Sequence, residues 1–170
     1  SLHSPGIKVI FGNNEATKKI LDVFQRAYDT FKCQYLVVHP DKVKDWKIFD
    51  NYHFNIAVEN MSDDVPFATP ENLKPIFEKN PNYKMVLDVN HAYKAYKSPK
   101  LTDELSAAFS DIISEIHISG YDTFHDPLYQ TKQLDIIQSI PDKKLPIIIE
   151  SGCDTIEDMK REYNYIKQNL

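Results

Sequence analysis

MVLDVNHAY, residues 85–93, joins a short apolar run directly to a charged residue. Met85 to Leu87 has the length and composition of a buried strand, and Asp88 marks its end. The same junction with His, Asp or Glu recurs along the chain. The six junctions are Leu2-His3, Val38-His39, Val58-Glu59, Leu87-Asp88, Ile116-His117 and Ile149-Glu150. Successive junctions lie 20 to 36 residues apart, close to one βα unit, so we expect the six polar side chains at one edge of a parallel sheet.

Helical patterns separate these apolar runs. The first is the stripe Ile20, Phe24, Ala27 and Phe31. The expected N-terminal caps are Asn13 or Asn14, Thr69 before Pro70, and Asp154 with Glu157 as a capping box. We expect helices near residues 15–31, 70–79, 131–139 and 154–168, with a shorter one around Leu105 and Phe109. The alternation of strands and helices predicts an α/β fold with right-handed crossovers. Apolar and polar residues alternate little within the expected strands, which indicates a sheet covered on both faces.

The composition is that of one globular domain over residues 1–170. Twenty Lys and Arg stand against 25 Asp and Glu, a net charge of −5, and this balance gives no general basic field for a polyanion. Cys33 and Cys153 lie 120 residues apart without a CxxC motif, which favours reduced thiols and a cytoplasmic protein. The apolar runs are too short for a membrane span or a signal peptide, so we expect no membrane partner.

The residues at the strand ends have the chemistry of metal ligands. Mixed imidazole and carboxylate groups suit Zn²⁺, Mn²⁺, Co²⁺ or Mg²⁺, and carboxylates crowded together without a cation would repel one another. A single carboxylate after a strand is more often the N-cap of the next helix. The joint pattern of six junctions therefore carries the prediction of a divalent metal site.

Several motifs at these junctions resemble the xylose-isomerase-like TIM-barrel superfamily, which contains sugar isomerases and epimerases together with endonuclease IV. The motifs are Glu59 in AVEN, Asp88 and His91 in LDVNHAY, His117 in EIHIS, His125 in HDPL and Glu150 in IIIES. The resemblance implies a TIM (β/α) barrel. A complete barrel has eight βα units. This chain shows about six of them, so we expect an incomplete or truncated barrel.

The isomerase branch implies one divalent metal. Its ligands would be Glu59, Asp88, His117 and Glu150. Glu59 and Glu150 would act as acid and base through an enediolate, and His91 would orient a hydroxyl group. The implied substrate is a small sugar or sugar phosphate. This branch is our preferred interpretation.

The endonuclease IV branch implies a multinuclear zinc site that hydrolyses DNA at abasic sites. The additional ligands would be His3, His39, His91 and His125. The chain departs from this pattern at Thr123, where the family has a carboxylate, and at Gly6, where it has a DNA-inserting Tyr. A DNA partner is expected only under this alternative. A third alternative is a metal-binding barrel without activity. The sequence leaves the oligomeric state open.

A basic and aromatic segment follows His91. Lys94 and Lys97 interleave with Tyr93 and Tyr96. Such a pattern suits contacts with phosphates and bases, but a solvated loop whose tyrosines cover the barrel rim is the favoured interpretation.

Overall fold

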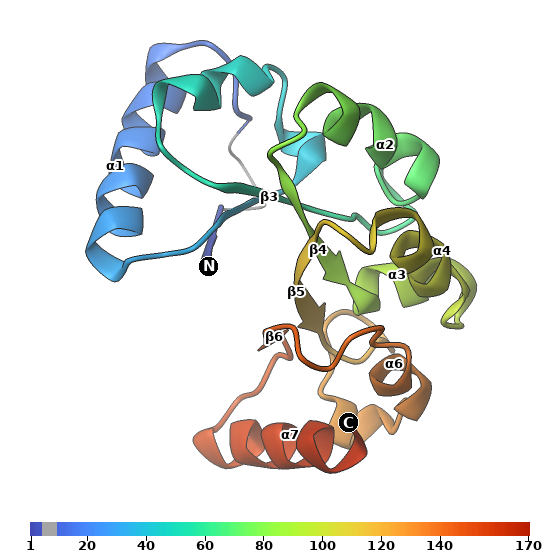
Figure 1. The fold of residues 1–170 in the computed structure, drawn as a ribbon. Coiled ribbons are helices and arrows are strands. Elements are labelled where there is room, and N and C mark those ends of the chain that lie inside the picture. The colour runs from blue at the N-terminus through green and yellow to red at the C-terminus, as the bar shows by residue number, and fades with distance from the viewer. Residues whose placement is uncertain (5–9) are drawn as a thin grey trace.

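The computed structural model describes residues 1–4 and 10–170, so Gly6 lies outside the described residues. Within them, six strands form one parallel sheet in the order β1-β2-β3-β4-β5-β6. The strands are β1 (Leu2–His3), β2 (Leu36–Val38), β3 (Ile56–Glu59), β4 (Lys84–Asp88), β5 (Ile113–Ile118) and β6 (Ile147–Ile149). A doubly wound sheet reverses its strand order at a switch point. This order never reverses, and the sheet curls into a half-barrel flanked by helices (Figure 1).

The connecting segments are mainly helical. The α-helices are α1 (Glu15–Phe31), α2 (Pro70–Lys79), α3 (Val89–Tyr96), α4 (Lys100–Phe109), α5 (Leu128–Thr131), α6 (Leu134–Gln138) and α7 (Ile156–Asn169). Two 3₁₀ segments, η1 (Pro40–Lys42) and η2 (Trp46–Asn51), follow β2. In the described part of the chain, no helix combines the length and apolar character that crossing a membrane requires.

The predicted strands and the first two helices are confirmed. The five predicted strand residues Val38, Val58, Leu87, Ile116 and Ile149 lie in adjacent parallel strands. Helix α1 begins after Asn14, whose side chain accepts a hydrogen bond from the Thr17 amide, and α2 begins at Pro70 after Thr69. Both helices have the predicted bounds.

One predicted helix, one predicted cap and one predicted loop were wrong. The single helix expected near 131–139 is broken by Lys132, whose positive φ of 59° ends α5 before α6 begins. The N-cap of α7 is Thr155, one residue after the expected Asp154. The Thr155 hydroxyl accepts a hydrogen bond from the Asp158 amide. The residues after Asp88 form helix α3 and not a loop, because the Asp88 side chain caps that helix.

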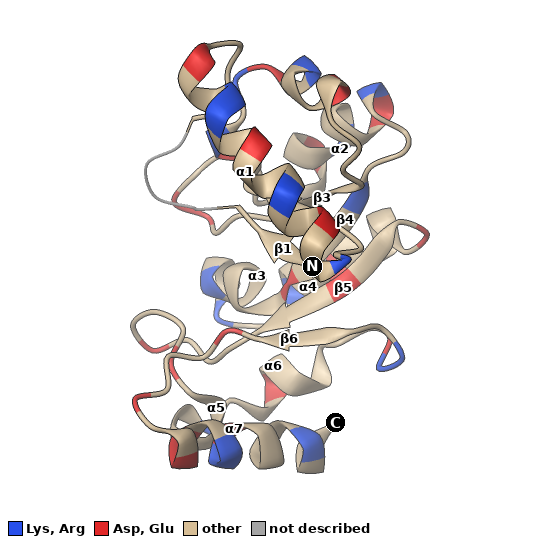
Figure 2. Ribbon diagram, turned by 90° about the vertical axis from the view of Figure 1, so that its left-hand side faces the viewer, with Lys and Arg blue, Asp and Glu red and all other residues tan. Residues whose placement is uncertain are grey.

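Helix α1 turns only part of the predicted stripe inward, since Ile20 and Phe24 are partly buried and pack against the core. Its buried residues are Thr17, Leu21 and Tyr28, whereas Phe31 is 74% exposed. Figure 2 shows both signs of charge along the solvent side of this helix. The apolar stripe is therefore displaced by about one residue from Ile20 and Ala27.

The two faces of the sheet differ in character. One face packs against the helices in the main core, with Leu36, Val58, Leu87 and Ile116 among its members. The other, inner face carries a separate small cluster of Val37, Ala57 and Val86. Two residues further along these strands stand His39, Glu59 and Asp88. Since side chains alternate along a strand, these polar groups share the inner face with the small cluster.

Strand β6 departs from the expected burial. It is the last strand in the sheet order, with β5 as its neighbour in the described residues. Ile148 is 38% exposed and Ile149 is 37% exposed. The apolar run at 147–149 therefore does not mean full burial, because a strand at a sheet end has less cover than a central one.

A buried carboxylate ties α7 to the rest of the fold. Glu162 is 0% exposed and accepts hydrogen bonds from the backbone amides of Leu128 (2.8 Å) and Tyr129 (2.9 Å). It also accepts from the Ser151 hydroxyl at 2.5 Å. One side chain therefore joins α7 to the start of α5 and to the residue that follows Glu150.

Candidate metal centre

The inner face gathers the predicted strand-end residues at the carboxyl edge of the sheet. Asp88 and His117 are direct partners in the β4–β5 register, and Glu59 pairs with Val86 one strand away. The side chains of Glu59, Asp88 and His117 are each only 1% exposed, whereas that of Glu150 is 25% exposed. Three of the groups are thus buried and one faces the solvent.

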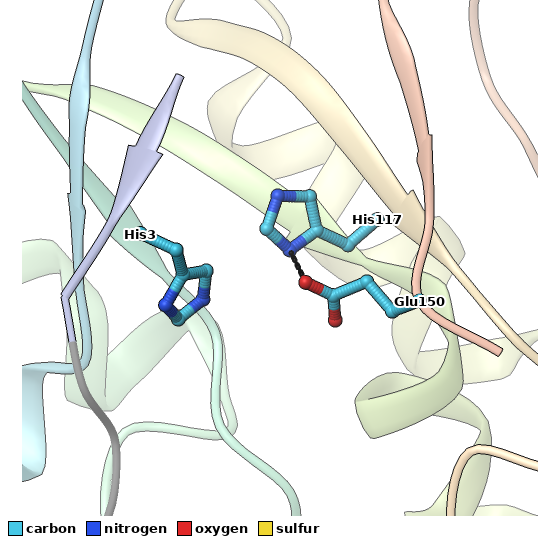
Figure 3. Close-up of side chains that lie close together, drawn as sticks. All are labelled: His3, His117 and Glu150. Atoms are coloured by element: carbon cyan, nitrogen blue, oxygen red, sulfur yellow. Dashed lines mark ion pairs between the residues drawn. The ribbon is translucent and has the colours of Figure 1, made fainter. Parts of the chain in front are cut away.

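Glu59, Asp88, His117 and Glu150 form what we call the four-ligand set. Each residue offers one ligand atom, and these atoms all lie within 4.8 Å of one another. The His117 Nδ1 atom is 3.1 Å from Glu150 Oε1 and 3.3 Å from Glu59 Oε1. Figure 3 shows His117 and Glu150 facing each other, with His3 opposite them on β1. The structure therefore brings together the four residues that the sequence pattern predicted to converge.

Three atoms of the four-ligand set lack hydrogen-bond partners. In the described residues, Glu59 Oε1, Asp88 Oδ2 and His117 Nδ1 are buried without one. Buried polar atoms are almost always paired in proteins, so three unpaired atoms at one point indicate a missing partner. All three are ligand types that divalent cations accept. The residues present therefore fit a divalent metal ion.

Neighbouring groups turn these atoms toward the common point. The His117 Nε2–H donates to Glu115 Oε1 at 3.2 Å, which leaves Nδ1 to face the four-ligand set. Asp88 Oδ1 accepts from the His91 amide at 2.9 Å and caps α3, which leaves Oδ2 without a hydrogen bond, 3.3 Å from His91 Nδ1. Asn60 bonds the Asp88 backbone on both sides, accepting from its amide at 2.8 Å and donating to its carbonyl at 3.0 Å.

The carboxylates shift the protonation of the metal-free site. Although burial opposes its charge, His117 has a pKa raised to about 12, because Glu115 accepts a hydrogen bond from its ring and the carboxylates of Glu150 and Glu59 lie beside it. Burial raises the pKa of Asp88 to about 7. Burial also disfavours the charge of Glu59, but its histidine partners outweigh this and hold its pKa well below the usual range.

We predict that metal affinity rises with pH. Above about pH 7, a metal must displace one proton, that of His117. Below about pH 7, it must displace two protons, those of His117 and Asp88. Affinity should therefore rise about tenfold per pH unit for each proton released, with a steeper slope on the acidic side. Zn²⁺ titration calorimetry in buffers of different ionisation enthalpy counts these protons. A flat affinity between about pH 6 and about pH 8 would contradict the assignment.

Glu115 is a residue of the candidate site that the sequence analysis did not single out. It lies two residues before His117 on the same strand and is 4% exposed. The period of two along a strand is the signal that could have identified it, because residues i and i+2 share a face. Asn60, beside Glu59 in AVEN, had no comparable signal.

Replacing Glu115 by Leu should weaken metal binding about 10- to 100-fold, as expected when a ligating histidine loses the carboxylate that orients it. Glu115→Gln keeps an oxygen near His117 and should restore part of the affinity. Calorimetric titration with Zn²⁺ and circular dichroism of both variants provide the test. Equal affinities for the parent and Glu115→Leu would show that Glu115 does not orient His117.

His3, His39 and Glu59 form a second group, the histidine set, within the same 4.8 Å limit. Glu59 Oε2 lies 2.9 Å from His3 Nε2 and 3.1 Å from His39 Nε2. The His3 Nδ1–H donates to the Ser4 carbonyl at 2.8 Å, which orients the ring. The two oxygens of Glu59 therefore face two different ligand sets.

His91 and His125 lie nearby but join neither set. Their ring centroids are 5.6 Å apart, and no group of three ligand atoms within the described residues includes either one. His91 Nδ1–H donates to the Asn60 carbonyl at 2.9 Å, and His125 Nδ1 contacts the Ser119 hydroxyl at 2.8 Å. His91 Nδ1 nevertheless lies 3.3 Å from Asp88 Oδ2 and 3.7 Å from Glu59 Oε1, so His91 borders the four-ligand set.

The loop beside His125 contains the carboxylate of Asp126, which bonds within the loop. Asp126 accepts from the amides of Asp122, Thr123 and Phe124 and from the Thr123 hydroxyl. The Asp126 carboxylate therefore holds this turn.

A cavity of about 360 Å³ opens above the ligand sets. The predicted site residues in its lining are His3, His39, Glu59, His91, His125 and Glu150. Pockets of 300 to 1,000 Å³ suit small molecules. The cavity therefore has the size of a small-molecule site.

Comparisons with known proteins support the fold. No model of a protein family matches the sequence, and no curated protein matches it. Among solved structures, the chain is similar to the TTHB071 protein from Thermus thermophilus, soaked with ZnCl₂. The similarity covers 100% of this chain and 77% of that chain, with a TM-score of 0.59 and 12% sequence identity. At this identity it shows the fold alone, an α/β half-barrel of six parallel strands flanked by helices.

Proposed function

We propose that the protein is a divalent-metal-dependent isomerase or epimerase of sugars or sugar phosphates. The observation that carries the proposal is the convergence of three buried, unpaired ligand atoms beneath a cavity of small-molecule size. The ligand set suits Zn²⁺, Mn²⁺, Co²⁺ or Mg²⁺. The similar TTHB071 structure was soaked with ZnCl₂, and zinc is one of these ions.

Glu59, Asp88, His117 and Glu150 would hold the ion. When bound, a divalent ion polarises a substrate carbonyl and makes the adjacent C–H more acidic. Glu150 is the most exposed carboxylate of the set, so it is placed to take that proton and generate an enediolate. Glu59 is the second carboxylate of the acid–base pair. His91 lines the cavity and would orient a substrate hydroxyl.

Exchange of the substrate α-proton in D₂O tests this mechanism. The protein loaded with Mn²⁺ or Zn²⁺ should add one deuterium beside the carbonyl of at least one ketose in a panel. Glu150→Gln should abolish the exchange, whereas Glu157→Gln, on the exposed side of α7, should leave it intact. A metal-loaded protein that exchanges no ketose would contradict the proposal.

The histidine set supports a second candidate, a phosphodiester hydrolase of the endonuclease IV type. A carboxylate shared by two ligand sets suits two ions, which together can stabilise the attacking and leaving oxygens. Cleavage of DNA that contains an abasic site would favour this candidate over the isomerase.

The two candidates predict different metal counts for His3→Ala and His39→Ala. Under the isomerase proposal, each variant retains the full metal content, because neither histidine belongs to the four-ligand set. Under the hydrolase candidate, each variant loses about one equivalent of metal, since a ligand of the second ion is missing. Elemental analysis after dialysis provides the measurement. A loss of one equivalent in both variants would reverse our preference.

A further inference from the structure

Glu162 on α7 is a buried carboxylate that the proposed mechanism does not use. It is 0% exposed, and it accepts hydrogen bonds from the Ser151 hydroxyl and from the amides of Leu128 and Tyr129. Taking a carboxylate out of water costs free energy that apolar packing avoids. The packing of α7 alone therefore does not explain a carboxylate at this position.

The segment after β6 shows where this carboxylate acts. The Glu150 amide donates to a carbonyl on β5 at 2.9 Å, and the Gly152 amide donates to the His125 carbonyl at 2.8 Å. Between them, the Ser151 hydroxyl donates to Glu162 Oε1 at 2.5 Å. Three consecutive residues are thus bonded to three different parts of the fold, and the bond in the middle is the one made by side chains.

Glu150 depends on these bonds more than the other members of the four-ligand set do. Glu59, Asp88 and His117 belong to strands, whereas Glu150 follows the end of β6. The Glu150 side chain is also 25% exposed, against 1% for each of the other three. Neither burial nor a place within a strand therefore fixes Glu150 Oε1 at its distance of 3.1 Å from His117 Nδ1 (Figure 3).

Glu162 also holds the segment that follows the His125 turn. The amides of Leu128 and Tyr129, which donate to it, lie at the start of α5. The Tyr129 hydroxyl donates to Asp158 Oδ1, one turn earlier on α7, at 2.7 Å. Since His125 is also bonded to the segment after β6, both segments beside the candidate site are fixed to the same carboxylate.

We infer that Glu162 is a positioning residue for the metal ligand Glu150 and acts through the Ser151 hydroxyl. The inference rests on the four-ligand set of the proposed function and adds a residue of α7 to that site. A charged acceptor binds a hydroxyl more strongly than a neutral one does. The carboxylate therefore restrains the residue next to Glu150, and a ligand held within about 0.5 Å of its productive position binds metal more tightly.

Ser151→Ala tests this role because it removes one bond and leaves both amide donors of Glu162 in place. We expect the affinity for Zn²⁺ to fall about 10- to 100-fold, as for other outer partners of metal ligands. Ser151→Thr keeps the hydroxyl and should restore most of the affinity. Ser106→Ala is the matched control, because it removes a hydroxyl that donates to the Thr102 carbonyl on α4, and it should bind zinc like the parent. Titration calorimetry measures the affinity of the parent and of each variant.

The spectrum of the cobalt-loaded protein separates positioning from a loss of stability. Co²⁺ binds to the same ligand types as zinc, and its visible absorption depends on the number and geometry of its ligands. At saturating Co²⁺, Ser151→Ala should change this spectrum, and Ser151→Thr should match the parent. Glu162→Gln keeps the length of the side chain but loses its charge, so it should change the spectrum in the same direction as Ser151→Ala. A purely structural role would lower the midpoint of urea unfolding and leave the spectrum unchanged.

Separate results bear on the inference and on the proposed function. A zinc affinity and a cobalt spectrum equal to those of the parent in Ser151→Ala would overturn the inference, as would an equal loss of affinity in Ser106→Ala. Neither result bears on the isomerase proposal, which α-proton exchange decides. A parent protein that binds zinc but exchanges no ketose would contradict that proposal and leave the role of Glu162 standing.

Discussion

Glu59→Gln is expected to abolish binding of divalent metal at both ligand sets. Glu59 belongs to each set, with Oε1 toward His117 and Oε2 toward His3 and His39. The substitution removes the charge that two groups of ligands share. Loss of even an outer partner weakens metal binding 10- to 100-fold, so loss of this ligand should exceed about a hundredfold. Zn²⁺ calorimetry with elemental analysis measures the effect.

Two further variants serve as controls for the loss of metal binding in Glu59→Gln. Glu150→Gln should abolish binding at the four-ligand set, because a dication needs its charge, but it leaves the histidine set complete. Asp64→Asn also removes a carboxylate from the cavity lining, at a residue outside both sets, and should bind metal like the parent. If the Glu59→Gln variant folds and retains the metal content of the parent, Glu59 is not a ligand shared by the two sets.

Glu162→Ala is expected to lower the free energy of unfolding by about 3 to 5 kcal/mol. The substitution leaves the amides of Leu128 and Tyr129 and the hydroxyl of Ser151 without their acceptor. Hydrogen bonds to a charged group contribute about 1.5 to 3 kcal/mol each, and adjacent ones do not add fully. Urea unfolding followed by circular dichroism gives the value.

The control for this variant lies on the same helix. The Glu157 side chain is 65% exposed, and Glu157→Ala should change stability by less than about 0.5 kcal/mol. A similar small change in Glu162→Ala would show that the buried carboxylate does not hold α7 in place.

The strand ends were predictable because two local signals coincide there. An apolar run ending in a charged residue marks the end of each strand, and regular spacing along the chain brings those ends to one edge. The convergence of the six strand-end residues follows from this pattern, whereas the choice of the four-ligand set among them came from the resemblance to the xylose-isomerase-like superfamily. By contrast, the start of α3 was missed because the joint pattern favoured Asp88 as a ligand over the N-cap that an aspartate after a strand also fits, and the structure shows both uses.

Other features depend on contacts that no local pattern records. Glu162 is buried on a charged helix because it meets amides more than 30 residues away in sequence. The break at Lys132 requires a left-handed backbone in a residue type that rarely adopts one. The exposure of Ile148 depends on the place of β6 at the end of the sheet order.

The two oxygens of the Asp88 carboxylate have different roles, one in the fold and one in the candidate metal site. Its Oδ1 starts helix α3, and its Oδ2 is one of the unpaired ligand atoms. Selection for a stable protein alone would accept asparagine here, because an amide oxygen caps a helix as well as a carboxylate does. Selection for metal binding would not, because the amide lacks the charge. Asp88→Asn should therefore keep the cap of α3 and the fold while it lowers the affinity for a divalent metal.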